Sequence, residues 1–212
     1  MRTAFVDDGG VKSPSSRAPW VAPLYVGAVQ LGAYALARMP AHARTELLRE
    51  HSTNVENLRA GRWRTLATSA LFVERPLPAP YSAGLLLALG TAEVAWGARR
   101  AAAVFAAGHV GASLLVHAGL LAARKVSEET ERAVDVGASY GFNATLGALA
   151  ASLPRRGARV TATTGLLALG VRPVLRKRRT FTDAGHLAAI GVGVVVGAAM
   201  RARRNRATPG VM

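Results

Sequence analysis

The chain has 212 residues, a formal net charge of +15 and no cysteine. The lack of cysteine excludes disulfides, thiolate zinc sites, iron–sulfur clusters and a cysteine nucleophile. Half of the residues are apolar, and long runs of Ala, Leu, Val and Gly alternate with short Arg-rich segments. This pattern is typical of helices that cross a hydrocarbon core about 30 Å thick. Backbone groups in lipid must be satisfied within the segment, so we predict an all-α polytopic membrane helical bundle.

The high positive charge has two interpretations, a nucleic-acid surface or the flanks of membrane helices. The basic residues stand at the ends of apolar runs instead of forming one stripe. Lys and Arg beside anionic lipid headgroups explain that placement. We therefore expect the lipid bilayer as a partner and no nucleic acid.

Six apolar runs are candidates for transmembrane helices. Residues 1–19 contain no apolar stretch of the kind found in a cleavable signal peptide, so we expect a cytoplasmic N-terminal tail there. We expect residues 20–200 to form one six-helix membrane domain, followed by a basic C-terminal tail, 201–212. The six expected spans cover residues 20–39, 81–97, 101–123, 133–153, 160–175 and 184–200.

The segment 40–80 is too polar to cross a bilayer, and its first half, 41–58, has helical composition. We expect a short interfacial helix and then a loop that packs on the membrane face. An even number of spans places both termini on one side. With that long loop set aside, twelve Lys and Arg lie on the side of the termini against eight on the other, which favours cytoplasmic termini. We expect a multi-pass protein of a bacterial plasma membrane.

Two polar residues near the starts of spans could carry chemistry, Ser139 in span 133–153 and His186 in span 184–200. One span separates these two spans, so they run in the same direction, and each residue lies about one helical turn inside its span. Ser139 and His186 are therefore expected at the same depth, within hydrogen-bond reach. A serine needs such a base to become a nucleophile.

Small residues are expected to let these two helices approach closely. Gly137 and Gly141 form one GxxxG pair, and Gly193 and Gly197 form another. Free backbone N–H groups at the start of a helix could also stabilise an oxyanion beside Ser139.

These features resemble the rhomboid family of intramembrane serine proteases. The rhomboid signature is a GxS motif at the start of the fourth helix and a histidine near the start of the sixth, matched here by Gly137-Ala138-Ser139 and by His186. Further matches are Trp63–Arg64 in the first loop, the stretch 89–97 with Glu93 at the end of the second helix, and Gly147 in the fourth helix.

The resemblance implies a protease that cleaves transmembrane segments of other proteins with a Ser139–His186 dyad, without a metal or an organic cofactor. Backbone N–H groups near Ala138 and the side chain of Asn143 are the candidate oxyanion donors. The second-helix histidine and asparagine of many rhomboids are missing in the stretch 71–76, and Tyr140 replaces the usual small residue after the serine. A catalytically inactive rhomboid-like protein that binds transmembrane helices is therefore the alternative.

Other polar residues within the spans favour structural roles. His109, Ser113 and His117 lie on one stripe of span 101–123, but the two histidines are about 12 Å apart along the helix axis, too far to share a metal ion. We expect structural hydrogen bonds from them, and Glu93 as a tether to an arginine or to backbone donors. A small transporter that uses Glu93 and these histidines as a polar pathway is a third hypothesis, which the absence of an inverted repeat disfavours.

Overall fold

The computed structural model describes residues 18–123, 127–176 and 180–207, and within these ranges all regular structure is helical. The all-α prediction is therefore confirmed. The long helices are α1 (Val21–Ala37), α5 (Ala79–Trp96), α6 (Ala98–Ala122), α8 (Ser139–Ser152), α9 (Arg156–Val174) and α10 (Phe181–Ala207). The short elements are α2 (Ala41–His51), α3 (Val55–Arg59), α4 (Thr65–Thr68), the 3₁₀ turn η1 (Ser69–Leu71) and α7 (Glu128–Glu131).

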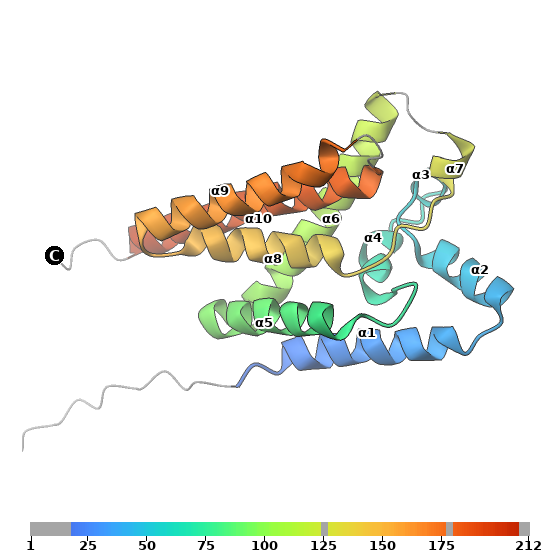
Figure 1. Cartoon of the computed structure of the whole chain (residues 1–212), viewed down its shortest axis with the longest axis horizontal. Coiled ribbons are helices and arrows are strands. Elements are labelled where there is room, and N and C mark those ends of the chain that lie inside the picture. Colours follow the sequence, from blue (N-terminus) through green and yellow to red (C-terminus); the bar gives the residue numbers. More distant parts are fainter. Residues whose placement is uncertain (1–17, 124–126, 177–179, 208–212) are drawn as a thin grey trace, which may run out of the picture.

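The long helices form a bundle in which neighbours in the chain run in alternating directions. Figure 1 shows α8 and α10 side by side with α9 along them, and α1 beside α5 in a second layer. Helix α6 crosses obliquely and packs against α5, α8 and α10. Helices α8 and α10 end on the side where α1 begins, whereas α2, α3, α4 and α7 gather at the opposite end. The prediction that the helices of the fourth and sixth apolar runs, α8 and α10, are parallel neighbours is therefore confirmed.

Two of the described helices, Ala98–Ala122 and Phe181–Arg206, are long and apolar enough to cross a membrane, and Val21–Ala37 is a shorter apolar helix. The remaining expected spans stay predictions. The fourth helix begins at Ser139, six residues later than expected, because 133–138 is not helical. The sixth begins three residues earlier than expected, at Phe181.

Close contact between α8 and α10 depends on glycines of α10. A Cβ on Gly193 would collide with the backbone of Ala144, and a Cβ on Gly197 would collide with the backbone of Ala148. Gly147 of α8 lies in the same way against the backbone of Ile190. The expectation for the Gly193 and Gly197 pair is confirmed, and this contact fixes how the two helices are aligned.

The expectation for Gly137 and Gly141 is wrong. Gly141 does pack closely, but against the ring of Phe105 on α6 and not against α10. Gly137 precedes the helix and has a φ of 135°, a conformation that suits glycine because it has no Cβ. The partner of a small-residue face depends on how the helix is rotated, which the GxxxG spacing does not specify.

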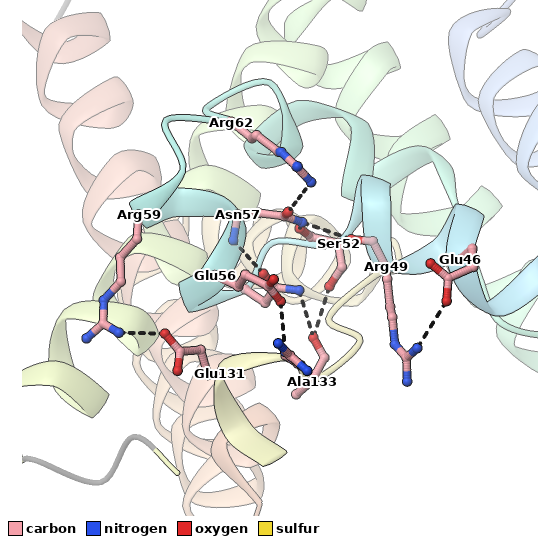
Figure 2. Close-up of polar contacts among 11 residues, drawn as sticks. Glu46, Arg49, Ser52, Glu56, Asn57, Arg59, Arg62, Glu131 and Ala133 are labelled. Carbon is pink, nitrogen blue, oxygen red and sulfur yellow. Dashed lines mark hydrogen bonds and ion pairs between the residues drawn. The ribbon is translucent and has the colours of Figure 1, made fainter. Parts of the chain in front are cut away.

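The first loop, residues 40–80, folds into α2, α3, α4 and η1 on one end of the bundle. The expected interfacial helix 41–58 is broken at residues 52–54, where Asn54 caps α3 by accepting a hydrogen bond from the backbone N–H of Asn57 at 2.8 Å. Leu48 and Val55 of this loop are buried. Figure 2 shows the polar contacts that join the loop to α7 and to the segment after it. Arg59 pairs with Glu131 of α7, and Ser52 bonds to Ala133 of the following segment.

Candidate functional site

Ser139 is the first residue of α8, and the segment 133–138 before it, here named the approach segment, is held by the first loop. The backbone N–H of Asp135 donates to Ser52 Oγ at 2.6 Å, and the backbone N–H of Thr53 donates to the carbonyl of Asp135 at 3.1 Å. Ser52 Oγ also donates to the carbonyl of Ala133 at 3.2 Å. Side chains and backbone of the first loop thus replace the hydrogen bonds that a helix would have made.

The approach segment is also tied to the centre of the bundle through Gly137. Its backbone N–H donates to the carbonyl of Ser69 at 2.8 Å. Ser69 is fully buried, and its Oγ lies 2.9 Å from His109 Nε2 and 2.8 Å from Thr53 Oγ1. A buried chain of hydrogen bonds therefore connects the first loop and α6 with the backbone immediately before Ser139.

The first turn of α8 has no side-chain cap. Its N-cap residue is Ala138. The first N–H groups of an α-helix have no partner within the helix, so they point outward beside Ser139. The side chain of Asn143 does not share this position, since its Nδ2 donates to the carbonyl of Ser139 at 2.9 Å.

His186 lies in the second turn of α10, and its Nε2 is buried without a hydrogen-bond partner. The start of this helix is capped by Thr180 and Asp183, which exchange hydrogen bonds between side chain and backbone at 2.8 and 3.3 Å. Ser139 and His186 both belong to the described part of the chain, where no hydrogen bond joins them. The two residues lie at the same end of the contact between α8 and α10, without a hydrogen bond between them.

Tyr140 occupies the space between the two histidines. Its ring lies 5.5 Å from that of His186 in an edge-to-face contact and 6.1 Å from that of His109. The ring covers Gly185, where any Cβ would collide with it. Its hydroxyl lies 3.5 Å from Asp135 Oδ2. The residue after Ser139 is thus a buried wedge between α6, α8 and α10.

Asp135 is the ionisable group of the approach segment, outside the helices. Burial raises its pKa to about 7, although the hydrogen bond from the Tyr140 hydroxyl favours the ionised carboxylate. This carboxyl group therefore changes charge near neutral pH, next to the first turn of α8.

A family model for rhomboid-like proteins matches residues 12–206, which is nearly the whole chain. The chain belongs to the rhomboid-like family. No curated protein and no solved structure matches it. The family and the apolar helices identify a rhomboid-type membrane protein, and the GxS motif of this chain is the start of α8 described above.

The two histidines of α6 make hydrogen bonds to different partners, His109 to Ser69 of the first loop and His117 within its own helix. Besides the bond between His109 and Ser69, His117 Nδ1 lies 2.7 Å from the carbonyl of Ser113. Among the described residues, no group of three or more His, Cys, Asp or Glu side chains could hold a metal ion. Both histidines thus make hydrogen bonds within the protein, which agrees with the expected structural hydrogen bonds.

The remaining motif residues lie away from Ser139. The Glu93 carboxylate accepts hydrogen bonds of 3.0 to 3.2 Å from the backbone N–H groups of residues 20–22, so it caps the start of α1. This is a tether to backbone donors. Trp63 is exposed, and Arg64 forms an exposed ion pair with Glu50 at 3.0 Å.

Sequence reasoning missed Thr53 and Ser69. Both are fully buried, and they connect the first loop with α6 and with the approach segment. They stand in a polar segment where Ser and Thr are common, so no spacing distinguishes them. His109 was a usable signal for Ser69, because a buried histidine requires a hydrogen-bond partner.

Proposed function

We propose that this rhomboid-like protein is an intramembrane serine protease in which Ser139 is the nucleophile and His186 the base. The observation that carries the proposal is the unpartnered Nε2 of His186 on α10, a helix that runs parallel to α8 in direct contact with it. A buried imidazole nitrogen without a partner is available to accept the proton of a nearby hydroxyl. The substrates would be transmembrane segments of other proteins, and no cofactor is needed.

The proposed reaction has two steps. Ser139 Oγ attacks the carbonyl carbon of the scissile peptide bond while its proton passes to His186, which then protonates the leaving amine. Water hydrolyses the resulting acyl-enzyme with His186 again as base. The uncapped N–H groups at the start of α8, next to Ala138, would hold the oxyanion. In this scheme the bond between Ser139 and His186 forms in the substrate complex, since catalytic hydrogen bonds are often loose in free enzymes.

The proposed placement in the membrane is six spans, with residues 20–200 as the membrane domain between the cytoplasmic tails 1–19 and 201–212. The first loop and the approach segment then lie on the outer side of a bacterial plasma membrane. The alternating directions of the long helices support this placement (Figure 1). The Arg-rich end of α10 would face the cytoplasm, as the positive-inside rule favours.

A second candidate is a rhomboid-like protein that binds transmembrane helices without cleaving them. Two contacts favour it. The ring of Tyr140 packs against His186, and the amide of Asn143 is bonded to the carbonyl of Ser139 instead of being free for an oxyanion. If these contacts persist with a substrate bound, Ser139 is never activated.

A fluorophosphonate probe separates the two candidates. Ser139 Oγ would displace fluoride from phosphorus, forming a stable adduct, so wild-type protein in nanodiscs should be labelled. Ser139→Ala and His186→Ala should abolish labelling. Ser152→Ala, at the other end of the same helix, should leave it unchanged. Absence of wild-type labelling under conditions that keep the protein folded would support the non-catalytic candidate.

A further inference from the structure

A groove opens at the Arg-rich end of the bundle, away from Ser139. It lies between the end of α5, the first half of α6 and the end of α10, and it encloses about 680 Å³. The residues that line it are Ala95, Trp96, Arg100, Ala103, Val104, Ala107, Val196, Met200, Arg201, Arg203 and Arg204. The proposed reaction uses none of them.

The groove has an apolar wall and a cationic rim. Trp96, Val196 and Met200 are partly buried on the wall. Four arginines complete the lining, one from α6 and three from α10, and none of the described residues that line the groove is acidic. An apolar wall beside concentrated positive charge matches a molecule with a hydrocarbon part and an anionic part.

The length of α10 places this rim at the membrane surface. Its 27 residues extend about 40 Å, about 10 Å more than the hydrocarbon core is thick. If the helix enters the core near Phe181, its last two turns, which start at Arg201, reach the headgroup layer. Trp96 lines the same groove, and tryptophan is common at the membrane surface.

Arg201 is the most unusual of these arginines. Its Nε is buried and has no hydrogen-bond partner. A buried guanidinium N–H without an acceptor is costly, whereas a charge-assisted hydrogen bond to a phosphate oxygen would satisfy it. The structure thus contains a donor that lacks its acceptor beside an apolar groove.

We infer that this groove binds one anionic phospholipid, with its phosphate on Arg201 and Arg203 and an acyl chain along Trp96 and Val196. The inference rests on the membrane placement proposed above but not on proteolysis. Arginine binds phosphate well because its planar donors match phosphate oxygens in pairs. The inner leaflet is the anionic leaflet, so the ligand is abundant where the groove lies.

Native mass spectrometry of the full chain in detergent tests this inference. Wild-type protein incubated with phosphatidylglycerol should retain one lipid molecule, and with phosphatidylcholine none. Removing two charge-assisted bonds with Arg201→Gln and Arg203→Gln should weaken retention about tenfold or more. The matched control is Arg155→Gln with Arg156→Gln, an equal loss of charge on exposed residues outside the groove, and it should change retention less than about twofold.

Two further arms separate a lipid site from a simple anion site. Ala103→Phe fills the apolar wall from an exposed position and leaves every arginine in place, so it should also weaken retention. Excess inorganic phosphate should fail to displace the lipid. Displacement of the lipid by phosphate would overturn the inference. So would an equal loss of lipid retention in the Arg201, Arg203 variant and in the Arg155, Arg156 control. A protein that retains the lipid but is not labelled at Ser139 would refute the protease alone.

Discussion

Two regions position Ser139, and they do so by opposite means. The contact between α8 and α10 depends on glycines, with Gly193 and Gly197 against the backbone of α8. The approach segment is not helical and depends on hydrogen bonds from Ser52, Thr53 and Ser69. Packing therefore fixes which helix faces α8, whereas polar contacts fix where α8 begins. The difference predicts that the two regions respond to different substitutions.

The largest expected effect is at Gly193. Gly193→Ala adds one methyl group against the backbone of Ala144, which cannot move without separating the helices, so we expect a loss of about 3 kcal/mol in unfolding free energy. Gly191→Ala is the control on the same helix, where a Cβ meets open space, and it should be neutral or stabilising. Thermal unfolding in detergent measures both. Equal stability of the two variants would show that the contact is not close-packed.

Ser69→Ala should have the next largest effect. It leaves His109 Nε2 and Thr53 without their shared partner, which we expect to cost about 2 kcal/mol. Ser82 is the control, because its Oγ is buried without a partner, and Ser82→Ala should be neutral or stabilising. Hydrogen exchange should also increase in the approach segment of Ser69→Ala. Unchanged hydrogen exchange in the approach segment would show that these buried hydrogen bonds do not hold Ser139 in place.

Asp135 gives an expected effect that depends on pH. Its pKa in the folded protein is about 7, above the ordinary value of 3.8, so folding favours the protonated carboxyl group. Stability should therefore fall as pH rises from about 4 through about 7. Asp135→Asn should flatten that part of the pH profile. A profile that stays as steep in the variant would assign the pH dependence to other groups.

The sequence predicted the packed region better than the polar one. Apolar runs and glycine spacing identified the helices, the parallel direction of the fourth and sixth, and the close approach at Gly193 and Gly197. Helix rotation was not predictable, so Gly141 was assigned to the wrong neighbour. The start of α8 was placed six residues too early because apolar residues continue into 133–138. Only contacts with a distant loop reveal that this backbone is not helical.

Tyr140 and Asn143 illustrate what motif matching leaves out. The GxS motif identified Ser139, but the contacts that decide its reactivity come from its neighbours in the helix. One neighbour packs on His186 and the other binds the carbonyl of Ser139. Side-chain direction in a short first turn depends on three helices at once, so no pattern within one of them predicts it.

Cysteine cross-linking tests most directly whether Ser139 and His186 face each other. The chain has no cysteine, so a Ser139→Cys, His186→Cys variant carries one pair of thiols. A disulfide needs Cβ atoms about 4 Å apart, and oxidation in nanodiscs should form it if the two positions meet during motion. Ala144→Cys with Ala189→Cys, from one buried cluster, is the positive control, and Ser152→Cys with His186→Cys, at opposite ends of the contact, is the negative control. The proposed dyad predicts a cross-link for the first pair, and its absence while the positive control forms would contradict the dyad.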